Sequence, residues 1–143
     1  MERLSVLGLD VGRKRIGVAG CDGLGLIATG LTTIVRQSFA ADVAQFQALV
    51  QERQVQRLVV GLPYTMDGAI GKQAQQVQNY AQRLARALDL PLEYMDERLS
   101  SLEAEAQMQQ QRLSLRDNKG LIDRKAAAII LQQWLDQRRN NPA

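Results

Sequence analysis

The sequence contains no histidine and only one cysteine, so any catalytic chemistry must use carboxylates, lysines or bound metal ions. This composition excludes serine-hydrolase triads, histidine general bases and most zinc sites. Three acidic residues are the leading candidates for chemistry, namely Asp10, Glu97 and Asp123. Carboxylate oxygens are the ligands that Mg²⁺ and Mn²⁺ prefer, and such a cation could activate a water molecule for hydrolysis.

Asp10 lies near the end of the first apolar segment, which is typical of a buried strand. Two glycines, Gly8 and Gly12, share its face of an alternating strand, and we expect them to leave open space for a metal ion and a phosphate. A carboxylate in an apolar strand is costly unless it is paired or bound to metal. The structural alternative is an acid at a strand end, satisfied by turn amides or paired with Lys14 or Arg15.

Glu97 and Asp123 are expected to reach the same end of the sheet as Asp10. Glu97 follows a short strand-like segment, and only one of the neighbours Asp96 and Glu97 can point toward Asp10. The carboxyl ends of parallel strands meet at one edge, where open α/β sheets keep their sites. Asp123 falls in the first turn of the last expected helix, at the end of its buried face. An exposed loop acid and a helix-dipole acid are the respective alternatives for Glu97 and Asp123.

Basic residues are concentrated at the C-terminal end. Residues 1–111 carry 11 basic and 12 acidic side chains, whereas residues 112–143 carry seven and three. This distribution favours a surface for a polyanion, although a solvated helix and tail would give the same pattern. The candidates for phosphate contacts are Thr65, Arg112, Arg116 and Arg124.

Strands and helices alternate along the chain to position these residues. Strand-like segments are expected at residues 4–12, 15–21, 25–35, 58–62 and 92–95. Helices are expected at 39–50 and 77–88, from a capping box at 100–103, and over 121–138. Three strands joined by hairpin turns, followed by alternating helices and strands, predict an α/β fold. Its mixed five-stranded sheet would be flanked by helices on both faces.

The length of 143 residues suits one domain, which we expect to cover residues 1–143. Within it we expect a mobile basic loop at 112–120 and a disordered tail at 139–143. No apolar run is long enough to span a membrane, and the N-terminus has no secretory signal pattern. The single Cys21 fits a reduced, cytoplasmic environment.

Four stretches in one order resemble the YqgF family of ribonuclease H-like nucleases, also called Holliday junction resolvases. They are residues 7–19, 59–68, 96–100 and 123–131, and the resemblance runs from about Leu7 to Leu135. The strings Asp-Glu-Arg-Leu-Ser and Gly-Leu-Pro-x-x-Met-Asp-Gly are quite specific to this family. The resemblance implies a ribonuclease H-like fold and a cytoplasmic nuclease that forms the 5′ end of 16S ribosomal RNA.

The resemblance also assigns roles to individual residues. Asp10, Glu97 and Asp123 match the family's acidic site, and Lys119 matches a basic position near the scissile phosphate. Arg13 departs from the family, because a small Thr is usual there, and it adds positive charge beside the site. Related junction resolvases use a fourth carboxylate, which is missing here after Asp123. Its absence argues against tight binding of two metals and against cleavage of four-way junctions.

These observations predict a metal-dependent nuclease that hydrolyses phosphodiester bonds in 16S ribosomal RNA precursor. Mg²⁺ or Mn²⁺ would be held by Asp10, Glu97 and Asp123, while Arg13 and Lys119 would stabilise the negative charge of the phosphate. Most of the six aromatic residues fall at helix-core positions, so a base-stacking surface is not expected. One alternative is a Holliday junction resolvase acting on branched DNA. Another is a non-catalytic RNA-binding assembly factor. An actin-like ATPase or sugar kinase is disfavoured, since those need two domains.

Overall fold

A computed structural model describes residues 3–65, 67–97, 106, 109 and 119–140. Its strands are β1 (Val6–Val11), β2 (Arg15–Cys21), β3 (Ala28–Val35), β4 (Arg57–Leu62) and β5 (Leu92–Asp96). Its helices are α1 (Phe39–Arg53), α2 (Lys72–Leu88) and α4 (Lys119–Asn140). The helix expected to open at residues 100–103 lies outside the described residues. Within the described part of the chain, no helix combines the length and apolar character needed to cross a bilayer.

The strands form one five-stranded mixed sheet in the order β3-β2-β1-β4-β5. The first three strands pair antiparallel, as a hairpin meander requires, whereas β1 pairs parallel with β4 and β4 pairs parallel with β5. The predicted sheet is therefore confirmed. This topology places the carboxyl ends of β1, β4 and β5 at one edge, where the expected acidic site lies.

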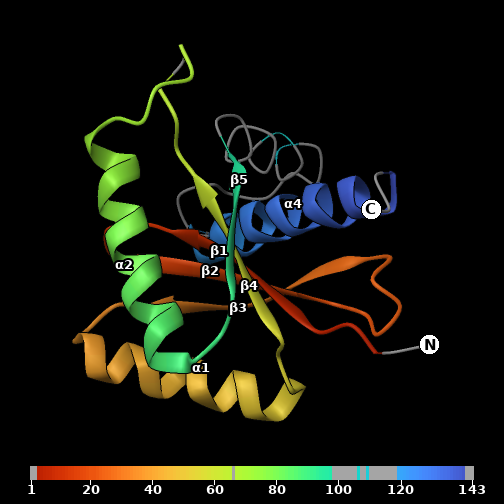
Figure 1. The fold of residues 1–143 in the computed structure, drawn as a ribbon. Coiled ribbons are helices and arrows are strands. Elements are labelled where there is room, and N and C mark those ends of the chain that lie inside the picture. The colour runs from red at the N-terminus through yellow and green to blue at the C-terminus, as the bar shows by residue number, and fades with distance from the viewer. Residues whose placement is uncertain (1–2, 66, 98–105, 107–108, 110–118, 141–143) are drawn as a thin grey trace.

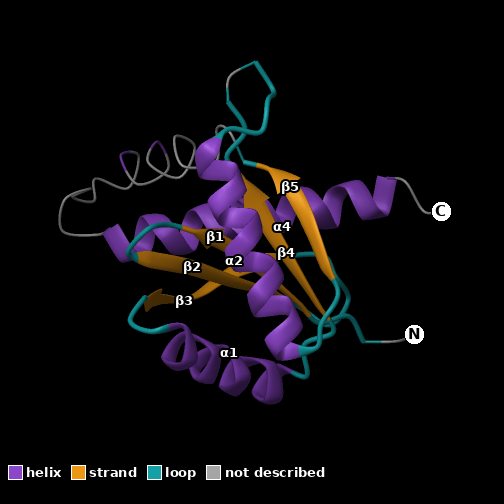
Figure 2. Ribbon diagram, turned by 60° about the vertical axis from the view of Figure 1, so that its left-hand side comes forward, coloured by secondary structure: helices purple, strands orange, loops and turns teal. Residues whose placement is uncertain are grey.

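Helices cover both faces of the sheet, with α1 and α2 on one face and α4 on the other (Figures 1 and 2). The alternation of side chains along β1 separates two cores. Leu7 and Leu9 pack with Phe46 and Leu84 on the α1 and α2 face, whereas Val6 packs on the face of α4. Asp10 therefore shares the face of Val6, as the alternation predicts.

Helix α4 lies very close to the sheet because glycines stand beneath it. A Cβ atom at Gly8 would come within 2.6 Å of Cβ of Leu131, and one at Gly12 within 2.8 Å of the Arg15 carbonyl oxygen. The prediction that these glycines leave open space in front of Asp10 is wrong. Helix α4 packs against Gly8 and the Arg15 backbone packs against Gly12, so neither glycine leaves room for a ligand.

Several element boundaries differ from the sequence prediction; helix α2, for example, begins at Lys72 and not at residue 77. Strand β3 begins at Ala28, not at residue 25, because the Asp22 carboxylate accepts from the backbone N–H of Leu26 and Ile27 at 2.7 and 2.8 Å and holds a turn. Helix α4 extends the predicted helix at both ends. Residues 119–120 and 139–140, expected in the loop and tail, are therefore helical, whereas 112–118 and 141–143 lie outside the described residues.

A side-chain contact explains the early start of α4. The Thr33 hydroxyl on β3 donates to the Gly120 carbonyl oxygen at 2.6 Å, which anchors the first turn of the helix on the edge strand. At the other end, Arg139 forms an ion pair with Asp136 one turn earlier. Both contacts favour helix where composition alone suggested a loop and a tail.

Candidate acidic site

The parallel strands bring two of the predicted acids together at the carboxyl edge of the sheet. Asp10 is the fifth residue of β1, and Glu97 directly follows β5. The backbone N–H of Glu97 donates to the Leu62 carbonyl oxygen at 3.1 Å, so the end of β4 fixes its position. Asp96 is exposed, whereas Glu97 is partly buried. Of the two neighbours, Glu97 is therefore the one that reaches Asp10.

The Asp10 and Glu97 side chains are hydrogen-bonded to each other. Burial and the adjacent Asp10 charge raise the pKa of Glu97 to about 9. Burial also raises the pKa of Asp10, and the charge of Asp123 adds to that rise. Because two carboxylates in contact in a partly dry site repel each other, the pair holds a proton at neutral pH.

Asp123 lies beside this carboxyl pair but has a different partner. Its Oδ2 accepts a hydrogen bond from Nε of Arg15 at 2.7 Å. Within the described residues, no group of three acids or other potential ligands is arranged to hold a metal ion. The site thus consists of a protonated Asp10–Glu97 pair and, next to it, an Asp123–Arg15 ion pair.

Arg15 is a site residue for which the sequence predicted only a possible pairing with Asp10. It begins β2, and Gly17 lies two residues further on the same face of that strand. Gly17 also pairs with Asp10 in the β1–β2 register. An Arg-x-Gly pattern on a strand facing Asp10 is the signal that could have revealed it.

Gly17 determines how closely Asp123 can approach the sheet. A Cβ atom at Gly17 would lie 1.9 Å from the Asp123 carbonyl oxygen, a distance that no real contact allows. Because Gly17 is opposite Asp10, the start of α4 lies directly beside the Asp10–Glu97 pair. This single glycine therefore brings a residue from the C-terminal helix to a site on the first strand.

Gly61 has a similar role for Glu97. It lies on β4 opposite Met95, and a Cβ atom there would be 3.0 Å from Oε2 of Glu97. The same atom would also come within 2.6 Å of Cδ1 of Ile130 on α4. A larger residue would push the Glu97 carboxyl group away from Asp10 or displace α4.

Thr65 uses its hydroxyl within its own loop. The hydroxyl donates to the Asp67 carboxylate and accepts from the Ala69 backbone N–H at 3.1 Å. The Thr65 backbone N–H also donates to the Ala69 carbonyl oxygen at 2.9 Å, which closes the turn. Its predicted contact with phosphate stays a prediction.

The predicted basic residues occupy different positions around the site. Arg13 is exposed in the turn after β1 and, with Arg36, lines a cavity of about 280 Å³. Arg124, next to Asp123, lines a second cavity of about 420 Å³ with Lys125. Lys119 is the first residue of α4. Arg112 and Arg116 lie outside the described residues, and the phosphate contacts of all five stay predictions.

The sequence matches the RuvX family, described as Holliday junction resolvase, over residues 4–137. The chain belongs to the RuvX family. Three curated relatives carry the name "Putative pre-16S rRNA nuclease". They come from Crocosphaera subtropica (70% identity, 97% of both chains), Gloeothece citriformis (68%, 97% of this chain and 92% of the relative) and Synechocystis sp. (65%, 98% and 92%). These matches confirm the resemblance to the YqgF nucleases.

Solved structures of RuvC from Thermus thermophilus share the fold of this RuvX chain. RuvC in complex with a Holliday junction substrate gives a TM-score of 0.58 at 14% identity, over 95% of this chain and 96% of RuvC. A second RuvC structure gives 0.56 at 13% identity, over 96% and 97%. The likeness confirms the ribonuclease H-like fold. Together, the family and the curated relatives confirm the predicted enzyme class, a nuclease that hydrolyses phosphodiester bonds.

Proposed function

We propose that this RuvX protein is a cytoplasmic, metal-dependent nuclease that processes the 5′ end of 16S ribosomal RNA precursor. The observation that carries the proposal is the direct contact between the Asp10 and Glu97 carboxyl groups at the carboxyl edge of the sheet. The choice of substrate is supported by the names of relatives that are 65–70% identical to this chain.

The residues present fit a divalent cation of the Mg²⁺ or Mn²⁺ type. The Asp10–Glu97 pair offers hard oxygen ligands, and its raised pKa values reflect burial and uncompensated negative charge. Positive charge at this position would replace the shared proton and relieve the repulsion. Asp10 and Glu97 would hold the cation, and Asp123 is the third proposed ligand. When bound, it would activate water and stabilise the leaving oxygen.

The chain's own residues supply the remaining functions. The Asp10–Glu97 pair must release its proton before a cation binds, so metal affinity should rise with pH. Arg15 fixes the Asp123 carboxylate beside the pair through the 2.7 Å hydrogen bond. The phosphate contacts proposed around this site come from the predicted hydroxyl and basic residues: Arg13, Thr65, Arg112, Arg116, Lys119 and Arg124. Such contacts position a nucleic-acid backbone without reading its sequence.

Cleavage of four-way junctions is the second candidate function. It is favoured by the description of the family and by the fold shared with RuvC. Along α4, however, Asp123 is followed by Arg124 and Lys125, and the next acid, Asp136, pairs with Arg139. A fourth carboxylate near Asp123 is therefore absent from this helix, which favours the RNA substrate over the junction.

One assay with two substrates tests the proposal. Purified protein with Mg²⁺ or Mn²⁺ should cut a labelled RNA that spans the 5′ end of 16S ribosomal RNA, and Asp10→Asn should remove most of the cleavage. Asp96→Asn is the matched control, because this exposed acid is adjacent to Glu97 but outside the pair, and it should retain activity. Cleavage of the synthetic junction alone would favour the second candidate. If neither substrate is cut, the RNA-binding assembly factor becomes the better description.

A further inference from the structure

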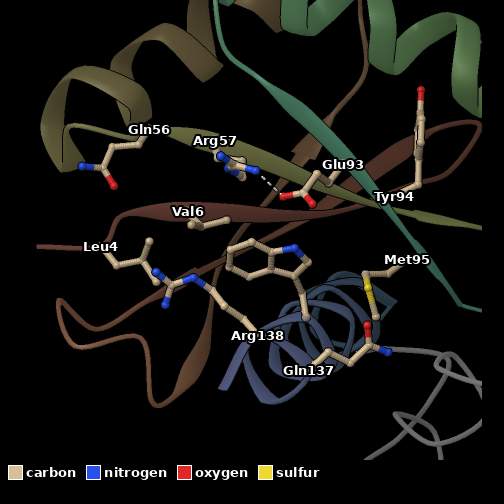
Figure 3. A pocket seen from close by; sticks show the side chains of 10 residues that line it. Leu4, Val6, Gln56, Arg57, Glu93, Tyr94, Met95, Gln137 and Arg138 are labelled. Carbon is tan, nitrogen blue, oxygen red and sulfur yellow. Dashed lines mark hydrogen bonds and ion pairs between the residues drawn. The ribbon is translucent and has the colours of Figure 1, made fainter. Parts of the chain in front are cut away.

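A cavity among the described residues lies at the edge of the sheet opposite the acidic site. Its volume is about 500 Å³, and its walls come from the starts of β1 and β4, from β5 and from the last turns of α4 (Figure 3). Val6, at the start of β1, lines it, whereas Asp10 lies near the other end of the same strand. We call this cavity the Trp134 pocket, since the protein's single tryptophan is part of its wall.

The Trp134 pocket combines an aromatic ring with cations and amides. The indole of Trp134 is half-buried, and the Arg138 guanidinium lies 6.0 Å from its ring centroid. Arg57 and Glu93 form an ion pair of 2.5 Å between neighbouring strands on the pocket wall, with both side chains about 40% exposed (41% and 42%). The side-chain amides of Gln56 and Gln137 also line it (Figure 3).

These groups match the chemistry of a nucleotide. An aromatic face stacks on any base, and primary amides can both donate to and accept from base edges. An arginine guanidinium binds phosphate with charge-assisted hydrogen bonds. Glu93 balances the charge of Arg57, which leaves Arg138 as the surplus cation of the pocket. A purely apolar peptide would leave these polar groups unpaired, so the pocket favours a base with its phosphate.

The distance between the pocket and the acidic site determines which nucleotide of a bound strand can reach the pocket. Trp134 follows Asp123 by 11 residues on α4, which corresponds to roughly 16 Å along the helix. A stacked strand rises about 3.4 Å per nucleotide, so roughly five nucleotides span this separation. A strand that enters the acidic site could therefore place a flanking nucleotide in the pocket.

We propose that the Trp134 pocket is an exosite that binds an unpaired nucleotide of the single-stranded region flanking the cleavage position. The base stacks on Trp134, and Arg138 contacts the adjoining phosphate. The inference deepens the proposed function and depends on it for the identity of the substrate. Binding at the pocket itself does not require catalysis. The proposal differs from the expectation that the chain lacks a base-stacking surface, and the titrations below decide between the two.

The single tryptophan makes direct detection possible. Asp10→Asn protein, which should not cleave, is titrated with a single-stranded RNA of eight nucleotides while tryptophan fluorescence is followed. We expect saturable quenching, and Arg138→Gln should weaken binding several-fold. Arg139→Gln is the matched control, because Arg139 pairs with Asp136 and does not line the pocket. Oligonucleotide binding that leaves the fluorescence unchanged would overturn the proposal.

Free adenosine monophosphate provides a second arm of this titration. It offers one base and one phosphate without the strand, so we expect it to bind much more weakly than the oligonucleotide. If it quenches the fluorescence as effectively as the RNA does, the pocket binds free nucleotides. That result would overturn its assignment to the substrate strand.

Substitution of the ring tests stacking separately. Trp134→Leu should weaken binding of a fluorescently labelled oligonucleotide on the order of tenfold, and Trp134→Phe should weaken it less. A urea midpoint close to that of wild type shows that the Leu variant is folded. The loss in cleavage efficiency should appear as a higher KM, and only for substrates with at least about five flanking nucleotides. An equal loss for substrates with and without the flank would contradict an exosite.

The exosite and the proposed function can fail independently. If RNA quenches the fluorescence but no substrate is cleaved, the exosite is supported and the assignment of nuclease activity to the acidic site is contradicted. Cleavage that is insensitive to Trp134→Leu, together with no quenching, would remove the exosite and keep the nuclease.

Discussion

Arg15 and Asp123 are joined by a 2.7 Å hydrogen bond between Nε and Oδ2, which links the start of β2 to the first turns of α4. These residues are 108 positions apart in the chain, yet their ion pair lies beside the Asp10–Glu97 carboxyl pair. The contact holds one proposed metal ligand next to the other two. It also provides a cation close to a site where four negative charges, three carboxylates and a phosphate, would otherwise meet.

Arg15→Gln should release the Asp123 carboxylate. We expect a stability loss of about 1 kcal/mol or less, because the pair is partly exposed, and a fall in cleavage rate on the order of tenfold. Urea midpoints and initial rates measure the two effects. Lys14→Gln, an equal charge change in the exposed turn, is the control. Equal rate losses in both variants would indicate a general charge effect and not a role for the ion pair.

The metal-free protein should lose stability as the pH rises from about 5 to 9. The folded pKa of Glu97, about 9, is above its unfolded value, so the folded state binds more protons across this range. The penalty is at most about 1.4 kcal/mol for each pH unit and is complete above the folded pKa. Urea midpoints in chelator at three pH values measure it.

Glu97→Gln is the control for this pH dependence. It cannot ionise, so its metal-free stability should change less with pH and should exceed that of wild type near pH 8. Saturating Mg²⁺ or Mn²⁺ should reverse that order, because a cation stabilises only a protein that binds it. A wild-type protein that gains stability relative to Glu97→Gln between pH 5 and 9 would contradict the raised pKa.

Asp10→Asn and Glu97→Gln should each remove most of the cleavage activity, and the double variant should lose little more. Groups that act as one unit give strongly non-additive losses. Single-turnover rates of the two single variants and the double variant measure the coupling. A double variant whose loss equals the product of the single losses would assign the two acids independent roles.

Gly17→Ala should disturb the site from the opposite strand. Its Cβ would lie 1.9 Å from the Asp123 carbonyl oxygen, so α4 or β2 must shift. We expect a destabilisation of roughly 1–3 kcal/mol and a large loss of cleavage. Gly120→Ala is the matched control, since its nearest contact would be an ordinary 3.5 Å and it lies within a helix. That variant should gain up to about 1 kcal/mol.

Arg13→Gln and Arg124→Gln should each weaken RNA binding evenly across sequences. Each lost phosphate contact should reduce the slope of log affinity against log salt by roughly 0.7–0.9. Fluorescence anisotropy at several salt concentrations provides the slopes. Arg86→Gln, at an exposed position in the last turn of α2, is the control. Unchanged slopes in all three variants would show that Arg13 and Arg124 are solvated surface residues that do not contact phosphate.

The sequence alone determined the parts of the site that depend on local geometry. Side chains alternate along a strand, so the face of Asp10, and the conclusion that only one of Asp96 and Glu97 can point toward it, follow from position along the chain. The alternation of strands and helices likewise predicted parallel strands whose carboxyl ends meet. Both predictions need only period-two alternation and chain connectivity, which are properties of neighbouring residues.

Tertiary structure decided what depends on contacts between distant segments. A glycine in the sequence does not reveal whether open space or a packed helix lies against it. Only the tertiary structure shows that α4 packs against Gly8. The partner of Asp123 could not be read from its helix, because Arg15 reaches it across the sheet. Trp134 lies on the same helical stripe as Ile130, yet it lines a cavity where that stripe leaves the core. In each case the sequence specifies the residue, whereas the close approach of α4 to the glycine-rich face of the sheet specifies its surroundings.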